Sequence, residues 1–424
     1  MKRSVVVIFF LTLIISCKED PSIVLPTVIS NAITNVSGNS AIAGGEVIGA
    51  GDSELTAIGL VAGEQPNPTI SNGIVSKIND VGLGEFTSEV TGLRSNTHYY
   101  IRAYATNRAG AAYGEDMETR TGIIIPTALE FNVITEIKGY NFDQAIGFQG
   151  SDDLHALFLA NRQINQPVLT QHERIYRYDL LTNSAIDIYD VTLDYISKEI
   201  QIINNQVKVV GGQYLRTYQT DLANQPLVTA HTKTFSRHGS AQMDGEIYAY
   251  GGDLNGIDSD KIWKWDDGVG TFLQIAIMPT AKSYAGGEIV NSKLYVFGGQ
   301  KEFQGTLHDD IIYVYSIKED SFETLHLPEA LYRSFTAQVG ELIYVAGHIN
   351  PTGNDNTDLF FGVFNTRDNS FTEIDINLSD ADGASIWALT AVGNDLYIVY
   401  GDPVNDIEEL SLEQTFTIQR AEIP

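Results

Sequence analysis

The chain has 424 residues, and at about 150 residues per domain this length predicts two or three domains. Hydrophobic residues make up 43% and charged residues 19%, a composition typical of globular proteins. The formal net charge of -28 argues against nucleic-acid binding and against an anionic lipid surface as partner, because both need a cationic face. The single cysteine excludes an intrachain disulfide and a multi-cysteine zinc site.

The first 16 residues have the pattern of a signal peptide. Lys2 and Arg3 form a positive n-region, and the apolar run Val5–Ile15 is shorter than the roughly 20 residues that a membrane-spanning helix needs. The run ends in Ile-Ile-Ser-Cys at Ile14–Cys17, which resembles the lipobox of bacterial lipoproteins. This resemblance implies cleavage before Cys17, lipidation of that residue and membrane attachment through the lipid only. An ordinary secretory signal with an incidental cysteine is the alternative.

Residues 17–25 are expected to form a lipidated tether. Lys18, Glu19 and Asp20 directly follow the cysteine and resemble the charged export tag of surface lipoproteins of the Bacteroidetes. The resemblance implies an outer-membrane lipoprotein that is exposed on the cell surface. A generic solvated tether on a periplasm-facing lipoprotein is the alternative.

Residues 26–122 alternate short β-rich stretches with turns of Gly, Asn and Ser, which predicts an immunoglobulin-like β-sandwich. The stretch Gly92–Tyr99 resembles the tyrosine corner of fibronectin type III domains, in which a tyrosine bonds back to upstream backbone. Tyr99 is the candidate for this bond. Tyr104–Gly110 is similar to the strand and hairpin turn of that family, whereas the core tryptophan of many members is missing. We expect a spacer domain, with a second binding module as the alternative.

After a linker at 123–127, residues 128–424 repeat at intervals of roughly 50 residues. Five repeats carry an apolar strand with glycine at its end: Val207–Gly212, Ile247–Gly252, Leu294–Gly299, Ile343–His348 and Leu396–Gly401. A degenerate copy precedes them at Leu157–Ala160. An aromatic strand such as Ile262–Asp266 and a further strand such as Phe322–Leu325 complete the pattern. This order resembles the Kelch repeat, and it implies an all-β chain with a six-bladed Kelch-type β-propeller.

Two segments are candidates for the outer strand of the last blade. Phe416–Arg420 follows the last glycine strand, and Leu129–Ile137 comes from the start of the repeat region. The sequence leaves the closure of the ring open between them.

A candidate ligand site follows from the repeat alignment. We align the repeats on the tyrosine of the glycine strand and take the position eleven residues earlier in each repeat. This position is the start of the preceding strand, a region that lies near the funnel mouth in Kelch-like propellers. These positions hold Ile146, Ser197, Arg237, Tyr284, Arg333 and Ile386, and His238 and Trp387 are neighbours. Two arginines suit a carboxylate or sugar acid, and aromatic rings suit stacking on a sugar. The alternative is that these arginines bond to carbonyl groups of neighbouring blades.

The sequence assigns no catalytic residue. Galactose oxidases of the Kelch type need copper and a Cys–Tyr crosslink, and the only cysteine here lies in the lipobox. A closer resemblance is to the six-bladed Kelch sialate mutarotases, which need an acid/base carboxylate near the sugar. Glu246, Glu288 and Glu341 lie in predicted blades, and no motif singles out one of them.

No metal or cofactor is predicted. The eight histidines are scattered, and the densest group, His308–Asp310, lies where a loop leads into a strand. Asp253–Asp260 resembles a calcium loop, but its glycine is at the wrong offset for an EF-hand, so we interpret it as a solvated loop.

Three classes of function remain, and each predicts a different structural feature. A non-catalytic binding protein for a glycan or an envelope or extracellular protein is the preferred hypothesis, and a glycan binder needs aromatic and polar groups in one funnel. A sugar-modifying enzyme needs a buried carboxyl group with a raised pKa there. A docking or adhesion component needs an exposed apolar patch.

Overall fold

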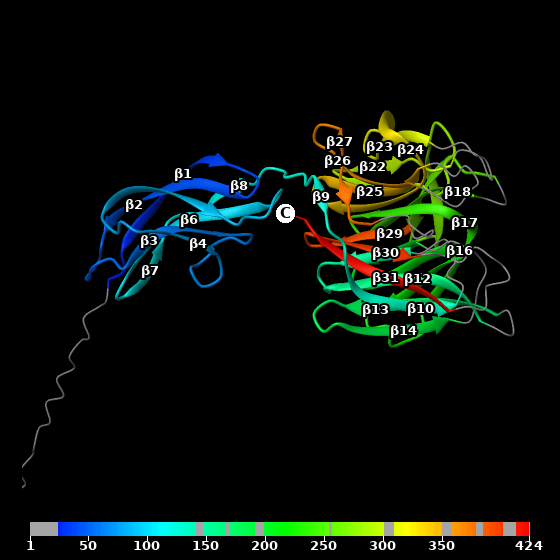
Figure 1. The fold of residues 1–424 in the computed structure, drawn as a ribbon, viewed down its shortest axis with the longest axis horizontal. Helices are drawn as coiled ribbons and strands as arrows, with labels where there is room; N and C mark the ends of the chain where they lie inside the picture. Colours follow the sequence, from blue (N-terminus) through cyan, green and yellow to red (C-terminus); the bar gives the residue numbers. More distant parts are fainter. Residues whose placement is uncertain are drawn as a thin grey trace, which may run out of the picture. The chain divides into compact units, whose positions relative to one another are not determined.

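The computed structural model describes residues 24–140, 147–165, 170–190, 199–253, 257–300, 309–349, 358–378, 385–401 and 413–423. Cys17, Ile146, Ser197 and His308 lie outside these ranges. The chain divides into two compact units, Met1–Ile124 and Ile125–Pro424, and the regular elements of both are β-strands (Figure 1). No helix with the length and apolar character needed to cross a bilayer occurs in the described ranges.

The first unit packs two antiparallel sheets face to face. One sheet has the order β1 (Thr27–Val36), β2 (Ser40–Gly49), β5 (Gly84–Thr91). The other has the order β4 (Ile74–Ile78), β3 (Ala57–Gly63), β6 (His98–Asn107), β7 (Gly110–Tyr113), and β8 (Met117–Arg120) also pairs with β6. Alternate residues of each strand point inward, and aliphatic side chains and one tyrosine fill the core without a tryptophan.

Tyr99 makes the hydrogen bond that the sequence predicts. Its hydroxyl accepts the backbone N–H of Arg94, five residues upstream, at 3.0 Å. Tyr99 is 1% exposed, and burial raises the pKa of its hydroxyl. The bond therefore fixes the bend between the loop and β6 from inside the core.

The second unit is β-propeller-like and consists mainly of four multistranded antiparallel sheets. Their orders are β11-β12-β13-β14, β15-β16-β17-β18-β19-β20, β21-β22-β23-β24-β25-β26-β27 and β10-β31-β30-β29. A short parallel pair joins β9 (Ala128–Leu129) and β28 (Asp375–Ile376). The bounds of the strands are β10 Asn132–Tyr140, β11 Gly147–Ser151, β12 Ala156–Asn165, β13 Thr170–Asp179, β14 Ser184–Asp190, β15 Glu199–Ile203, β16 Gln206–Gln219, β17 Leu227–Met243, β18 Glu246–Asp253, β19 Lys261–Asp266, β20 Thr271–Ile277, β21 Gly286–Val290, β22 Lys293–Phe297, β23 Asp309–Ser316, β24 Ser321–Val339, β25 Leu342–Ile349, β26 Asp358–Asn365, β27 Ser370–Glu373, β29 Ser385–Val392, β30 Asp395–Gly401 and β31 Glu413–Glu422.

The two long strands β17 and β24 each belong to two successive ladders. The first part of β17 pairs with β16, and the part from Ser236 onward pairs with β18. In the same way β24 pairs first with β23 and then, from Leu331 onward, with β25. Each long strand thus carries the chain from the outside of one ladder to the inner start of the next.

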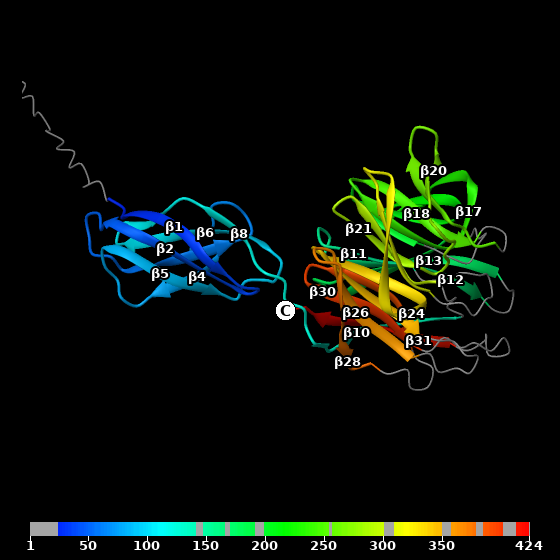
Figure 2. The same ribbon diagram turned by 90° about the horizontal axis from the view of Figure 1, so that it is seen from above.

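Both candidates for the outer strand of the last sheet are strands of that sheet. β29 is innermost, followed by β30 and β31, and β10 pairs antiparallel with β31 along the outer edge. Figure 1 and Figure 2 show β10 and β31 side by side, although they come from opposite ends of the unit. This pairing ties the start of the repeat region to its end.

Two of the repeated glycine pairs, Gly251–Gly252 and Gly298–Gly299, have a left-handed backbone. Gly251 has φ +62° and Gly252 has φ +82°, a backbone region that side chains with a Cβ rarely adopt. A Cβ on Gly251 would also collide with the backbone carbonyl of Lys282. The glycine pair therefore lets the end of β18 turn against the loop that enters β21.

Candidate functional site

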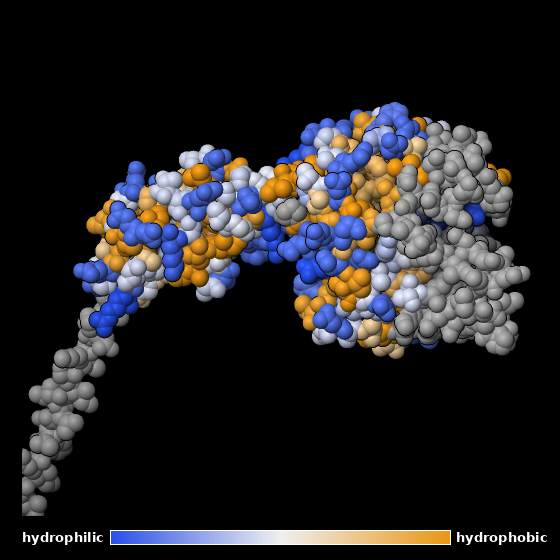
Figure 3. Space-filling view, viewed as in Figure 1, coloured by the Kyte–Doolittle hydropathy of each residue, from blue (hydrophilic) through white to orange (hydrophobic). Residues whose placement is uncertain are grey.

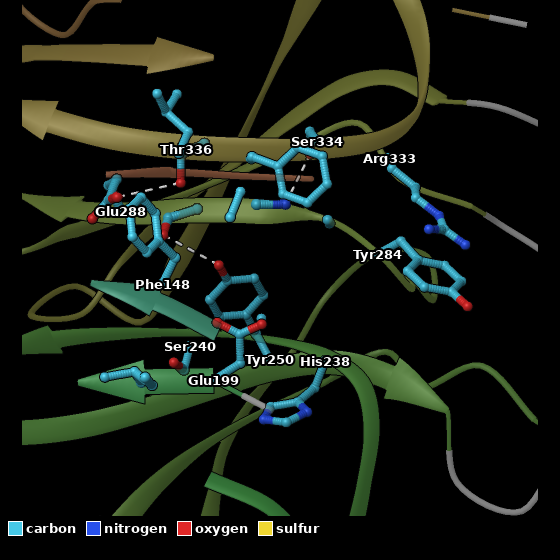
Figure 4. A pocket seen from close by; sticks show the side chains of 18 of the residues that line it. Phe148, Glu199, His238, Ser240, Tyr250, Tyr284, Glu288, Arg333, Ser334 and Thr336 are labelled. Atoms are coloured by element: carbon cyan, nitrogen blue, oxygen red, sulfur yellow. Dashed lines mark hydrogen bonds between the residues drawn. The ribbon is translucent and has the colours of Figure 1, made fainter. Parts of the chain in front are cut away.

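The inner segments of the sheets surround a cavity of ≈ 100 Å³. Its lining residues come from β11, β15, the second part of β17, β18, the loop before β21 and β21 itself, the second part of β24 and β29. Arg237, His238, Tyr284 and Arg333 of the predicted site are among them, and Trp387 is not. In Figure 4, Arg333 and Tyr284 lie together at one end of the group, away from Glu288 and Phe148.

Two guanidinium groups lie near the ring of Tyr284. The Cζ atom of Arg333 is 4.2 Å from the ring centroid, and that of Arg237 is 5.4 Å from it. Arg333 also lies 5.7 Å from the ring of Trp387 and 5.3 Å from that of Tyr332. Cation–π contacts of this kind are strengthened where water is excluded, and Arg333 is only 4% exposed.

The backbone explains why the repeat alignment found these residues. The N–H of Tyr284 donates to the carbonyl of Arg237 at 2.9 Å, and the N–H of Ser334 donates to the carbonyl of Tyr284 at 3.1 Å. Arg237 and Tyr284 both have a left-handed backbone, with φ +55° and +57°. Equivalent positions of neighbouring repeats are thus linked directly, at some cost in backbone strain.

Arg237 also contacts another protein group, and this group is a carboxylate, whereas the alternative interpretation expected carbonyl groups of neighbouring blades. The Arg237 guanidinium forms an ion pair with Asp253, whose Oδ2 is 3.2 Å away. Arg237 is also among the residues that line the cavity. The structural role and a ligand contact are therefore compatible.

His238 is a buried, neutral imidazole on the cavity wall. It is 3% exposed, and its ring lies 4.9 Å from that of Phe235. Burial lowers the pKa of His238 to about 3, and repulsion from His231 adds to this shift. Neither ring nitrogen has a hydrogen-bond partner within the described part of the chain. The imidazole can therefore offer one donor and one acceptor to a ligand.

Trp387 packs against Arg333 and does not itself line the cavity. Its Nε1–H donates to the carbonyl of Gly401 at 2.9 Å, and the ring of His348 packs edge-on against it at 5.6 Å. The indole is 7% exposed and contacts Arg333. Its position fixes the guanidinium of Arg333, and the neighbouring residue Ala388 lines the cavity instead.

Two carboxyl groups and a phenol lie deeper in the same cavity. Burial raises the pKa of Glu199 to about 8, with a further contribution from the charge of Glu288, and burial raises the pKa of Glu288 to about 7. The Thr336 hydroxyl donates to Glu288 at 3.3 Å. The hydroxyl of Tyr250 donates to the carbonyl of Gly287 at 3.2 Å, and burial raises its pKa well above the usual value. Near neutral pH this cavity therefore holds exchangeable protons.

Sequence reasoning named Glu288 without singling it out, and it missed Glu199. The two other glutamates that it named lie elsewhere. Glu246 pairs with the exposed Lys264 at 3.4 Å, and Glu341 forms an ion pair with Arg367. Glu199 is the first residue of β15 and comes two positions after Ser197 in the sequence, and this closeness to an aligned position is the one signal that points to it.

The acidic groups considered for metal binding have protein partners. Asp309 lies 3.2 Å from the buried ammonium of Lys282, and Asp310 contacts His326 at 2.9 Å. In the loop that resembles a calcium site, Asp253 pairs with Arg237 and residues 254–256 lie outside the described ranges. No group of three or more His, Cys, Asp or Glu side chains within the described ranges is arranged to hold a metal ion.

An apolar strip lies on the outer strand of one sheet. Val269 is 69% exposed just before β20, and Leu273 and Ile277 are exposed along it. Leu227 at the start of β17 is 70% exposed. In the face shown in Figure 3, apolar and polar residues are interspersed over the described parts of both units. The strip is the feature that a docking function would use.

Comparison with known proteins identifies one motif. Residues 234–279, which run from the second part of β17 to the end of β20, match the Kelch motif family. No curated protein matches the chain. The match and the all-β architecture fit a Kelch repeat protein with a β-propeller-like fold. A Kelch repeat suggests a β-propeller module that binds protein partners.

Proposed function

We propose that the second unit is a six-bladed propeller whose central cavity binds a ligand that carries a carboxylate, such as an acidic sugar. The observation that carries this proposal is the stack of Arg237, Tyr284 and Arg333 at one end of the cavity. A guanidinium group whose position is fixed by an aromatic ring is preorganised for a bidentate contact with a planar anion. The neutral His238 beside them suits a hydroxyl group of the same ligand.

Short-range contacts have to provide the affinity for such a ligand. The chain as a whole is strongly acidic, with a net charge of -28, so its long-range field repels anions. Buried or partly buried charge pairs are screened by salt much less than exposed ones. A carboxylate bound against the nearly buried Arg333 should therefore bind with weak dependence on salt.

The proposal includes the location of the protein. We propose an outer-membrane lipoprotein, anchored through Cys17 and exposed on the cell surface, with the first unit as a spacer of fibronectin type III type. The sheet orders of that unit and the bond between Tyr99 and Arg94 support the domain type. A periplasm-facing lipoprotein is the alternative, and metabolic labelling with a lipid precursor in wild type and Cys17→Ser tests the anchor.

Calorimetric titration tests the binding function. The full chain in a sugar-free detergent is titrated with sialic acid and galacturonic acid, and with glucose as the uncharged comparison. We expect saturable binding of an acidic sugar and a loss of about tenfold or more in affinity for Arg333→Ala, because a charge-assisted bidentate contact is removed. Equal binding of Arg333→Ala and wild type would refute the site. The exposed Arg367→Ala is the matched control.

A second candidate function is a sugar-modifying enzyme of the mutarotase type. The paired carboxyl groups of Glu199 and Glu288 favour it, because groups with a pKa near neutral can serve as general acid and base. Exchange between anomers of sialic acid, followed by NMR, tests this activity. We expect Glu288→Gln to abolish any acceleration, whereas a rate equal to that in buffer with the wild-type chain would exclude the enzyme function.

A further inference from the structure

A second, larger cavity follows the first along the inner strands. Its volume is ≈ 550 Å³, and it shares Gln149, Gln201 and Glu288 with the first cavity. On β17, β24 and β29 its lining residues come later in the chain than those of the first cavity. The two cavities are therefore successive parts of one polar passage, and the arginines are at one end only.

The second cavity is lined by groups that both donate and accept hydrogen bonds. Almost every inner segment contributes an amide or a hydroxyl, and β21 contributes a carboxyl group. These residues are Gln149, Gln201, Gln242, Gln338, Thr390 and Glu288. Gln201 and Thr390 are 5% and 3% exposed and form the floor, whereas Gln242 and Gln338 are exposed at the rim.

This lining selects against anions and against ligands that stack on aromatic rings. The described lining residues include no lysine, arginine or histidine to hold an anion, and no aromatic ring on which a sugar face could stack. Asp152 and Asp153 add acceptors at the rim. Hydroxyl groups act as donor and acceptor at once, so they match amides and carboxylates together. We propose that this cavity binds an uncharged, hydroxyl-rich ligand, the end of a neutral saccharide, through its hydroxyl groups.

The rim is held in place by tight turns. Asn204 and Asn205 have φ +50° and +59° in the two-residue hairpin between β15 and β16. The N–H of Gly393, in the hairpin between β29 and β30, donates to Asp152 at 2.5 Å. The amide of Gln338 donates to the carbonyl of Gly340 at 2.9 Å. A rim fixed in this way loses little conformational entropy when a ligand binds.

This inference goes beyond the proposed function, because it concerns the opposite end of the passage and a ligand of opposite chemistry. The arginine end suits a carboxylate, and the amide end suits a neutral saccharide. Variants at one end should leave binding at the other end unchanged. Failure of either site can therefore be recognised separately.

The test is calorimetric titration of the full chain in a sugar-free detergent with maltotriose, cellotriose and chitobiose. We expect saturable binding of at least one of these, and about tenfold weaker binding by the double variant Gln242→Ala/Gln338→Ala, which removes roughly two hydrogen bonds. Arg333→Ala should bind the saccharide as the wild type does. Gln274→Ala, an exposed amide on the outer strand β20, is the matched control.

Three results would overturn the inference. The first is no binding of any of the three saccharides by folded wild-type chain. The second is binding that the double glutamine variant leaves unchanged or that Arg333→Ala removes. The third is binding of Ca²⁺ alone at this end, lost in Asp152→Asn/Asp153→Asn, which would make the cavity a cation site.

Discussion

The guanidinium of Arg333 lies over the ring of Tyr284, with 4.2 Å between its Cζ atom and the ring centroid. The two residues occupy the same position of successive repeats, and the N–H of Ser334 bonds to the carbonyl of Tyr284. The backbone bond aligns the two repeats, and the guanidinium and the aromatic ring then meet as complementary side chains. This contact holds a nearly buried cation against an aromatic ring on the cavity wall.

Removal of the Tyr284 ring should weaken the site and the fold together. Tyr284→Leu loses the contacts to both arginines, and we expect the free energy of unfolding of the second unit to fall by about 1–3 kcal/mol. Tyr284→Phe keeps the ring, so its free energy of unfolding should fall by less than about 0.5 kcal/mol. Urea unfolding followed by tryptophan fluorescence measures this, because the three tryptophans, Trp263, Trp265 and Trp387, all belong to the second unit. Equal losses in both variants would assign the effect to the hydroxyl.

The strands and the mouth of the site could be predicted from the sequence, because a repeat fixes backbone positions. All five predicted glycine strands are strands, and Arg237, Tyr284 and Arg333 line one cavity. The repeat offset predicts which positions meet, and it needs no knowledge of side-chain packing.

The deeper part of the site depends on packing between repeats that no local pattern encodes. The raised pKa of Glu199 results from burial and from Glu288 on a different sheet. The offset also cannot tell which way a neighbouring side chain points. Trp387 follows the aligned position by one residue and packs behind Arg333, whereas His238, also one residue after its aligned position, lines the cavity.

The glutamate pair should make the fold less stable as pH rises. The pKa values of Glu199 and Glu288 are raised from 4.5 to about 8 and about 7. Between pH 4.5 and about pH 8 the folded chain binds more protons at these two groups than the unfolded chain does. The free energy of unfolding therefore falls as the pH rises through this range. We expect the fall in urea midpoint from about pH 5 to about pH 9 to be smaller in Glu199→Gln/Glu288→Gln than in wild type. Glu246→Gln, an exposed ion-pair partner, is the control, and an unchanged fall in the double variant would contradict the raised pKa values.

His238 should have the opposite effect at acid pH. Its pKa is lowered from 6.5 to about 3, so below pH 6.5 the unfolded chain takes up a proton that the folded chain refuses. Stability is lost as pH falls through this window. We expect His238→Gln to retain more of its neutral-pH urea midpoint at about pH 4 than the wild type does. His326→Gln, an exposed histidine, should behave as wild type, and identical acid profiles of all three would refute the assignment.

The bond between Tyr99 and Arg94 should stabilise the first unit alone. Tyr99→Phe leaves the partly buried N–H of Arg94 without this acceptor, and we expect a loss of about 1–2 kcal/mol in the free energy of unfolding. Because the first unit has no tryptophan, the loss should appear in unfolding followed by circular dichroism and not in tryptophan fluorescence. Tyr100→Phe, on the same strand, is the matched control. A shift of the tryptophan transition in Tyr99→Phe would show that the two units unfold together.

The ion pair of Lys282 and Asp309 should be the most sensitive polar contact of the second unit. Both side chains are fully buried, their charged atoms are 3.2 Å apart, and the ammonium also donates to the carbonyls of Gly298 and Ile311. Removal of one partner leaves an uncompensated charge in the interior, so Lys282→Met should cost about 3–5 kcal/mol. The double variant Lys282→Met/Asp309→Leu removes both charges and should recover most of this loss. A double-mutant cycle from urea unfolding, read by tryptophan fluorescence, measures the coupling. Additive losses would mean that Lys282 acts through the two carbonyls alone. Asp309 would then stabilise the start of β23 separately, where it accepts the N–H of Ile311.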